Sequence, residues 1–384
     1  MIKVLFISQW YPNRYDAMAG LFVQKHAEAV SLYCDVKVLY VHADENIDNF
    51  ETEKLNHLNL SELIVYYPCK KNGFINKAKN SINYIRAYWK GYKQIINDNW
   101  IPEIVHANIL TRTGFIAYVL KLWKDIPYVI TEHWSRYLPD RNSFKGFLRR
   151  QITKLVVKNA KAIFPVSESL KRAMLAHNLH NSNYLVVNNV VDEYFFNEIP
   201  VVHRLNKRII HVSCFDEEAK NVRGILRAVS ALSKIRQDFE FIIIGNGVDY
   251  GTVTEYAQTL NFHPGILHFM GEKKPEEVAN WLQNSDFFVM FSNFENSPVV
   301  ISESLVCGKP VLSSNVGGIS EHVNNSNGLL IAPGDEVALF EKMNYFLDHF
   351  NDYDENRIKL VAKEKFSYES VGKILFEKYK QAIE

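Results

Sequence analysis

The chain has 384 residues, of which 47% are hydrophobic and 23% are charged, and its formal net charge is +1. This length predicts two domains, because single hydrophobic cores rarely grow beyond roughly 250–300 residues. The composition excludes wholesale disorder, collagen-like sequence and a disulfide scaffold, and the near-neutral charge argues against a basic nucleic-acid binder.

Charge is distributed unevenly along the chain. Residues 1–190 contain 25 Lys and Arg against 15 Asp and Glu, whereas residues 191–384 contain 19 against 28. An asymmetry of this kind suggests two domains that face different partners.

The cysteines and the apolar runs indicate the compartment. Cys34, Cys69, Cys214 and Cys307 form no Cys-x-x-Cys pair, which argues against a disulfide framework or a zinc site and favours a reducing cytosol. The first residues do not resemble a signal peptide, because their apolar run is short and no small-residue cleavage site follows. No run of eighteen or more apolar residues is present, so we expect a cytoplasmic protein without a membrane span.

Short β-branched or aromatic runs, many of them apolar on both faces, recur along the chain as buried parallel strands do. In the first half they are Val4–Ser8, Val36–Val41, Leu63–Tyr67, Ile104–His106, Tyr128–Thr131, Ala162–Val166 and Tyr184–Val187; in the second half they are Arg208–Val212, Phe239–Ile244, Ile266–Met270, Phe287–Phe291, Pro310–Ser313 and Gly328–Ile331. Segments of helical period separate them, including Gly20–Ser31, Val222–Ile235 and, after the last strand, Tyr368–Ala382.

Alternating strands and helices predict βαβ units and hence an α/β fold of two doubly wound domains. Residues Asn188–Pro200 read as the linker between them. Ligands bind outside the carboxyl ends of strands in such sheets, so two facing domains would place a site in the cleft between them.

The stretch from Phe291 to Gly308 is the most informative part of the sequence. A strand ends, a short loop follows, and a helix begins for which Ser297 suits the N-cap and Pro298 the first helical position. The N–H groups around Ser297–Val300 would then form an anion site that the helix dipole strengthens.

Two acidic residues, Glu295 and Glu303, lie on either side of this helix start. Carboxylates accept hydrogen bonds from sugar hydroxyls, so the arrangement suits a nucleotide sugar, with its diphosphate on the amides and its hydroxyls on the acids. The spacing of the two acids alone favours a simpler interpretation, in which both are solvated surface residues. Only the strand–loop–helix context favours a site.

This stretch resembles the E-x7-E signature of the retaining glycosyltransferase family 4, enzymes of the GT-B fold. The resemblance spans nearly the whole chain, in the expected order. It covers Trp10–Pro12, Ala19–Ala27, Ile104–Asn108, Thr131–Trp134, Pro165–Leu170, Asn188–Asp192, Val212–Asn221, Ile244–Gly247, Met270–Gly271, Gly317–Glu321, Gly328–Asp335 and a closing helix near Phe366–Tyr379, which in the family crosses back to the first domain.

The resemblance implies domains at residues 1–195, joined by about 366–384, for the acceptor, and at residues 196–365 for the nucleotide-sugar donor. It also implies catalytic roles for His133 and Glu295, with His133 beside the reaction centre. The implied donor-binding residues are Gly20, Lys220, Glu295, Asn296, Ser297, Pro298, Val299, Val300 and Glu303.

Each implied role has a structural alternative. Gly20 would let the backbone approach the donor phosphate, but it also suits an ordinary turn. Lys220 would neutralise the diphosphate, with an ordinary surface lysine as the alternative. Glu303 would hold the ribose hydroxyls, with a solvated surface acid as the alternative. A lone histidine such as His133 is more often satisfied by backbone, and His106 is expected to pack or cap.

The chain departs from the family at Cys214, where an arginine usually provides a second cation for the diphosphate. Arg223 is a candidate to compensate, and losing a bidentate guanidinium should weaken diphosphate binding. No Asp-x-Asp or histidine cluster is arranged for a metal, so we expect no metal and no cofactor, with the nucleoside-diphosphate sugar as co-substrate.

Two basic segments, Lys70–Lys93 and Arg141–Lys161, each contain seven Lys or Arg, no acid and several aromatic or aliphatic residues. Such stretches suit an anionic membrane surface, and many relatives act on lipid-linked acceptors at the inner face of the membrane. The alternative is a pair of helices with core-facing aromatics and solvated lysines, which is the more frequent outcome.

The resemblance, together with these features, implies a metal-independent, retaining hexosyltransferase. It would move a sugar to a hydroxyl of a glycan or lipid-linked glycan in cell-surface polysaccharide synthesis. The other possibilities are a sugar-nucleotide 2-epimerase of the same fold and a non-catalytic nucleotide-sugar binding protein.

Overall fold

The computed structural model describes residues 1–57, 59–71, 73–97, 99–139, 141, 143–200 and 204–384. The chain divides into two compact units. The first unit comprises Met1–Val166, Lys171–Val190 and Tyr368–Glu384, and the second comprises Ser167–Leu170 and Val191–Ser367.

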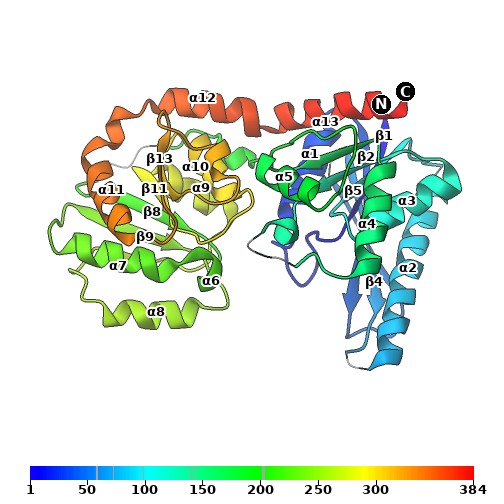
Figure 1. The fold of residues 1–384 in the computed structure, drawn as a ribbon, viewed down its shortest axis with the longest axis horizontal. Coiled ribbons are helices and arrows are strands. Elements are labelled where there is room, and N and C mark those ends of the chain that lie inside the picture. The colour runs from blue at the N-terminus through cyan, green and yellow to red at the C-terminus, as the bar shows by residue number, and fades with distance from the viewer. Residues whose placement is uncertain (58, 72, 98, 140, 142, 201–203) are drawn as a thin grey trace. The chain divides into compact units, whose positions relative to one another are not determined.

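The first unit is a twisted sheet covered by helices (Figure 1). Its strands are β1 (Lys3–Ser8), β2 (Asp35–Asp44), β3 (Glu51–His57), β4 (Leu60–Pro68), β5 (Ile104–Asn108), β6 (Tyr128–Glu132) and β7 (Ala162–Pro165). In the described residues their order is β3-β4-β2-β1-β5-β6-β7, and the pairs are parallel except β3 with β4. Val4, Leu5, Phe6 and Ile7 of β1 are all fully buried, as a central strand covered on both faces requires.

The helices of this unit are α1 (Leu21–Ser31), α2 (Phe74–Asn97), α3 (Thr113–Lys124), α4 (Phe147–Asn159), α5 (Glu168–Ala176) and α13 (Tyr368–Ile383), with a 3-10 turn at Ser135–Tyr137. The first turn of α5 falls in the second unit. Helix α13 packs along α1 (Figure 1). Only glycine fits at position 372 of this contact, because a Cβ there would lie 2.1 Å from the carbonyl oxygen of Ala29. Tyr379 of α13 also reaches the sheet, where its hydroxyl lies 2.5 Å from Nδ1 of His106.

The second unit is a parallel sheet of β8 (Lys207–Val212), β9 (Phe239–Ile244), β10 (Leu267–Phe269), β11 (Phe287–Met290), β12 (Val311–Ser314) and β13 (Gly328–Ile331). Its helices are α6 (Glu217–Lys220), α7 (Val222–Ser233), α8 (Tyr250–Thr259), α9 (Pro275–Gln283), α10 (Val299–Val306), α11 (Glu336–His349) and α12 (Glu355–Phe366), with 3-10 turns at Glu193–Phe195, Ile319–Glu321 and Phe350–Asp352. The described strands run in the order β10-β9-β8-β11-β12-β13. The order reverses between β8 and β11, and in doubly wound sheets ligands bind at such a switch point.

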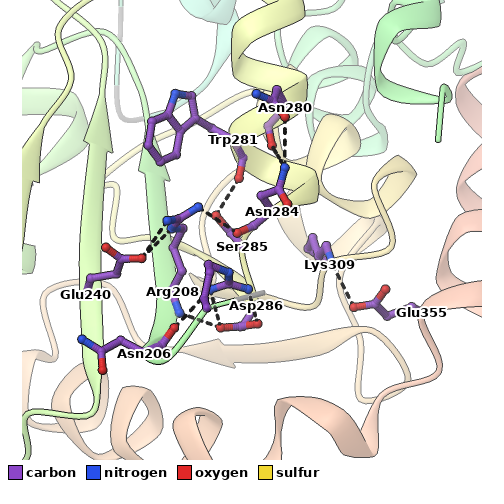
Figure 2. A network of polar contacts seen from close by, with 11 residues as sticks. Asn206, Arg208, Glu240, Asn280, Trp281, Asn284, Ser285, Asp286, Lys309 and Glu355 are labelled. Atoms are coloured by element: carbon purple, nitrogen blue, oxygen red, sulfur yellow. Dashed lines mark hydrogen bonds and ion pairs between the residues drawn. The ribbon is translucent and has the colours of Figure 1, made fainter. Parts of the chain in front are cut away.

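A polar network holds the amino-terminal edge of this sheet (Figure 2). Arg208, at the start of β8, donates from Nε to Glu240 of β9 over 2.8 Å, and its guanidinium lies 4.9 Å from the ring of Trp281. Asp286 accepts a hydrogen bond from the backbone N–H of Arg208 and forms an ion pair with Arg204. These contacts tie together the amino-terminal ends of the neighbouring strands β8, β9 and β11.

The structure corrects two of the sequence predictions. Tyr184–Val187 is not a strand; Tyr184 forms only an isolated bridge to Ile163, although the N–H groups of Leu185 and Val187 bind carbonyls of the β7 region. Conversely, β3 was not predicted, because Glu51–His57 is largely polar and lies at the exposed edge of the sheet. The linker region also contains the 3-10 turn Glu193–Phe195, whose Phe195 is buried.

Candidate functional site

The loop after β11 is held in place from two sides. The N–H of Asn293 donates to the carbonyl of Ala219 in α6, and the hydroxyl of Ser314 donates to the carbonyl of Ser292. Further along the loop, the N–H of Gly318 donates to the carbonyl of Asn296 over 2.8 Å. These bonds fix the backbone that carries Glu295.

Lys220 and Glu295 meet at the switch point of the second sheet. Lys220 ends α6, which follows β8, and Glu295 follows β11, so each comes from the carboxyl end of one of the two central strands. The Nζ atom of Lys220 lies 2.5 Å from Oε1 of Glu295, and the hydroxyl of Ser292 donates to the same oxygen over 2.8 Å. Two residues that the sequence separates by 75 positions thus form one site.

Both side chains of this pair are largely buried, with 15% of Lys220 and 9% of Glu295 exposed. Burial alone would lower the pKa of Lys220, but the charge of Glu295 and the hydrogen bond to it outweigh burial, so the pKa is raised. Lys220 therefore stays cationic at neutral pH.

Helix α10 begins one residue later than its sequence indicates. Pro298 occupies the N-cap with an extended backbone (ψ 116°), and its carbonyl accepts the first bond, from Ile301; Ser297 therefore precedes the cap and is not the N-cap itself. The amides of Val299 and Val300 lie in the first turn, where N–H groups have no partner within the helix. Residues 294–300 are all partly exposed, so this turn is accessible.

Glu303 lies one turn inside α10 and is partly buried. Burial, together with the nearby charge of Asp192, raises the pKa of its carboxyl to about 8. Within the residues that the structure describes, its carboxyl has no hydrogen-bond partner. A carboxyl in this state holds its proton at neutral pH, so it can both donate to and accept from hydroxyl groups.

In the first unit, Gly20 caps α1 with a left-handed backbone (φ 65°). A Cβ at this position would lie 2.4 Å from the backbone carbon and oxygen of Trp10, so packing within the turn already requires glycine. The proposed approach of a donor phosphate to Gly20 stays a prediction.

His133 follows β6 directly and lies beside α1. Its ring centroid is 4.5 Å from that of Phe22 and 5.3 Å from that of His26, and its side chain interacts with Asn189. Burial first, and then the neighbouring His26 and His106, hold the pKa of His133 well below its usual range. The ring is therefore neutral, and it suits a positioning hydrogen bond rather than a proton donor. His106 packs as expected, buried between Thr131 and Tyr379.

Sequence reasoning assigned no role to two buried polar residues near His133. Glu132 is fully buried, accepts from the N–H groups of Leu110 and Trp134, and has a pKa that burial raises to about 7. Asn108 is fully buried at the carboxyl end of β5, and neither of its amide atoms has a partner in the described residues. In the sequence, each of these two residues is only a polar residue at the end of an apolar strand. Because many ordinary loops begin in the same way, this pattern does not by itself indicate a site.

Arg223 does not accompany Lys220. Its guanidinium donates to the carbonyl of Thr252 and lies 5.3 Å from the ring of Tyr256, both on α8. Cys214 is exposed. Lys220 is thus the cation that contacts Glu295.

The described residues contain no group of three or more His, Cys, Asp or Glu suited to a metal ion. None of the described helices is both long enough and apolar enough to span a bilayer.

The chain matches two family models, "Glycosyl transferases group 1" over residues 206–349 and "Glycosyl transferase 4-like domain" over residues 79–190. An uncharacterized glycosyltransferase of Methanocaldococcus jannaschii is 30% identical over 268 residues, which are 70% of this chain and 71% of that protein. A putative teichuronic acid biosynthesis glycosyltransferase of Bacillus subtilis is 24% identical over 249 residues, which are 62% of this chain and 60% of the relative.

Solved structures share the fold over nearly the full chain. Sucrose-phosphate synthase from Thermosynechococcus elongatus superposes with a TM-score of 0.76 at 17% identity, and 99% of each chain is covered. HepE of Anabaena in complex with UDP also gives a TM-score of 0.76, at 15% identity, and 99% of this chain and 100% of that one are covered. The predicted α/β class, two Rossmann-like doubly wound domains of the GT-B type, is confirmed. This chain therefore belongs to the glycosyl transferases group 1 family, the family that its motifs resemble.

Proposed function

We propose that the protein is a metal-independent, retaining hexosyltransferase that uses a nucleoside-diphosphate sugar. Its acceptor would be a hydroxyl of a glycan or lipid-linked glycan in cell-surface polysaccharide synthesis. The contact between Lys220 and Glu295 carries this proposal, because it unites a cation for the diphosphate with a carboxylate for the sugar. The relative named for teichuronic acid biosynthesis supports a role in polysaccharide synthesis. The UDP complex of HepE supports a nucleoside-diphosphate donor.

In this proposal the amides of the first turn of α10 and Lys220 bind the diphosphate. Glu303 accepts hydrogen bonds from the ribose hydroxyls, and Glu295 and His133 hold the transferred sugar. Asn296, Ser297 and Pro298 shape the loop between Glu295 and the start of α10. Because Lys220 already contacts Glu295, a bound donor would share its ammonium between the carboxylate and the diphosphate.

The acceptor oxygen would attack the anomeric carbon on the face from which the diphosphate leaves. A bond from the acceptor oxygen to carbon forms, the bond from carbon to the diphosphate oxygen breaks, and the departing diphosphate takes the acceptor's proton. This route retains the anomeric configuration and needs no side-chain base. Catalysis then consists of positioning and of stabilising charge on the leaving group.

A screen of UDP-, ADP- and GDP-sugars tests the proposal. One donor should raise the melting temperature and be hydrolysed slowly, since a ligand that binds only the folded state stabilises it. With an acceptor, the product should keep the donor's anomeric configuration in an NMR spectrum, and EDTA should leave the rate unchanged. Glu303→Gln should weaken donor binding about tenfold or more, because an amide with one acceptor oxygen replaces a carboxyl group with two.

Three outcomes of this screen would count against the proposal. Inversion of the donor sugar at carbon 2 without any acceptor would identify the 2-epimerase, and tight binding without turnover would identify a binding protein. Unchanged donor affinity in the Glu303→Gln variant would remove the role given to that residue.

We also propose a peripheral contact with anionic membrane through Lys70–Lys93 and Arg141–Lys161, of which residues 72 and 142 lie outside the described residues. Tyr88, Tyr92 and Phe144 are buried, as the core-facing alternative requires. However, large apolar side chains of α2 and α4 stay exposed: Ile75, Ile82, Ile85, Phe147 and Leu148. Exposed apolar groups among lysines and arginines suit the interface of an anionic bilayer.

Flotation with anionic vesicles tests this contact. The double variant Phe147→Ser with Leu148→Ser should reduce vesicle binding at least about tenfold, because two exposed apolar side chains of about 1.5–3 kcal/mol each no longer enter the interface. Val337→Ser, at an exposed position of α11 in the second unit, is the control. Equal flotation of all three proteins, or flotation that persists after Lys70, Lys71, Lys77 and Lys79 are replaced by glutamine, would count against the contact.

A further inference from the structure

A polar pocket lies in the second unit, between α12 and the turn that precedes β13. Its volume is about 90 Å³, and its polar lining comes from His322, Asn324, Ser326, Asn327, Arg357 and Lys365. A single water needs only about 10–15 Å³ of such space, so the pocket has room for a group of several heavy atoms. None of its lining residues belongs to the candidate donor site.

His322 is the unusual member of this pocket. It is 6% exposed, yet neither of its ring nitrogens has a hydrogen-bond partner in the described part of the chain. The ring is held edge-on against Phe366, with 5.2 Å between the centroids. Buried polar side chains are nearly always hydrogen-bonded, so two orphaned nitrogens at the wall of a pocket point to a ligand.

The charged residues that line the pocket are all basic. Arg357 and Lys365 lie on α12, and both are exposed. Neither side chain has a hydrogen bond or ion pair within the described residues, and no acidic residue lines the pocket. A metal ion would be repelled here, and a neutral sugar would find no carboxylate to accept its hydroxyls.

The wall opposite α12 is rigid. Asn327 accepts from the N–H of Asn324 over 2.8 Å, and its amide donates to the carbonyl of His322 over 2.8 Å. The Oδ1 atom of Asn324 accepts from the N–H and the hydroxyl of Ser326, which leaves the amide hydrogens of Asn324 as possible donors to a ligand. The start of α12 is fixed as well, since Lys309 Nζ lies 2.9 Å from Oε1 of Glu355 (Figure 2).

We propose that the pocket formed by His322, Arg357 and Lys365 binds a phosphate-sized oxyanion, independently of the site around Lys220 and Glu295. A guanidinium, an ammonium and an imidazole that can protonate match a dianion, and a planar guanidinium suits the oxygens of phosphate in particular. The ligand is either free phosphate or the phosphate of a phosphomonoester, because both present the same group to the pocket.

The proposal predicts how His322 responds to the anion. Burial first, and then the charge of Lys365, lower its pKa to about 4. The lining contains no other titratable or charged group besides Arg357. A bound dianion stabilises the imidazolium, so sulfate, which stays doubly charged between pH 4 and 7, should move the titration midpoint of His322 upward.

Histidine-labelled full-length protein allows a direct test by NMR, with His322→Asn identifying the resonance and isothermal titration giving the affinity. Inorganic phosphate should shift the His322 resonance saturably, both in the wild type and in Lys220→Gln, which removes the cation of the donor site. The double variant Arg357→Gln with Lys365→Gln should bind phosphate at least about tenfold more weakly, since two charge-assisted contacts are lost. Lys363→Gln, an exposed change on the same helix but outside the pocket, should match the wild type.

Two results would overturn the proposal: a response to phosphate no larger than that to sodium chloride of equal ionic strength, or full affinity in the double variant. Glycerol 3-phosphate serves as the second probe. Tighter binding of this ester than of inorganic phosphate would identify a phosphomonoester as the ligand, and the reverse order would identify free phosphate.

Discussion

Replacement of Lys220 by glutamine should lower kcat/KM for the donor by about 100- to 1,000-fold, the usual loss when a preorganised electrostatic contact to a leaving group is removed. The effect is expected to be large because Arg223 is engaged by α8 and Cys214 carries no positive charge. The variant also leaves Glu295, 9% exposed, without its cation. Steady-state kinetics with the donor found in the nucleotide-sugar screen provide the measurement.

Lys234→Gln is the matched control for this change, since Lys234 is an exposed lysine of the same unit that follows α7. It should keep the wild-type rate. If Lys220→Gln were folded and within twofold of the wild type, the assignment of Lys220 to the diphosphate would be wrong.

Gly317→Ala should destabilise the second unit and disturb the site at the same time. Gly317 has φ of 58°, and a Cβ there would lie 2.0 Å from the carbonyl oxygen of Glu295. The left-handed backbone costs about 1–2 kcal/mol for a residue with a side chain, and a clash with fixed backbone adds about 1–3 kcal/mol. We expect the melting temperature to fall by about 6 °C or more, with donor turnover falling as the loop of Glu295 moves.

Gly334→Ala separates the two causes. Gly334 also has a positive φ, of 76°, but no atom lies within 4 Å of the Cβ that would be added. This variant should show only the backbone cost of about 1–2 kcal/mol and keep its turnover. Equal melting temperatures and equal rates for the two variants would show that the close approach of Gly317 to Glu295 affects neither stability nor turnover.

The sequence predicted much of this architecture because strong local signals agreed with the tertiary structure. The buried strands Val4–Ser8 and Phe239–Ile244 are apolar on both faces, and Gly308, a residue type that often follows the end of a helix, comes just after α10 with a φ of 81°. Local signals failed where tertiary context decided. β3 is polar because it forms the edge of the sheet. Tyr184–Val187 has the apolar composition of a strand, yet it lies along β7 with only one isolated bridge.

The site was predictable in its residue types but not in its contacts. The helix start at Pro298 and the acids beside it can be read from residue types that recur at such positions. The contact between Lys220 and Glu295 depends on β8 and β11 being neighbours, a pairing that no local pattern encodes. The exposed positions of Arg357 and Lys365 carried no signal, since a charged helix face is usually solvated, and the orphaned ring of His322 appears only once its burial is known.

The position of α13 at the end of the chain has a consequence for folding during synthesis on the ribosome. Leu375 and Tyr379, both fully buried, fill the core between α1 and the sheet of the first unit. Residues 1–190 leave the exit tunnel with that core still lacking its last helix, and all of residues 191–367 must be synthesised before it can arrive. The unit that is translated first is thus completed last, and until α13 has been synthesised the apolar surface that it covers has no helix packed on it.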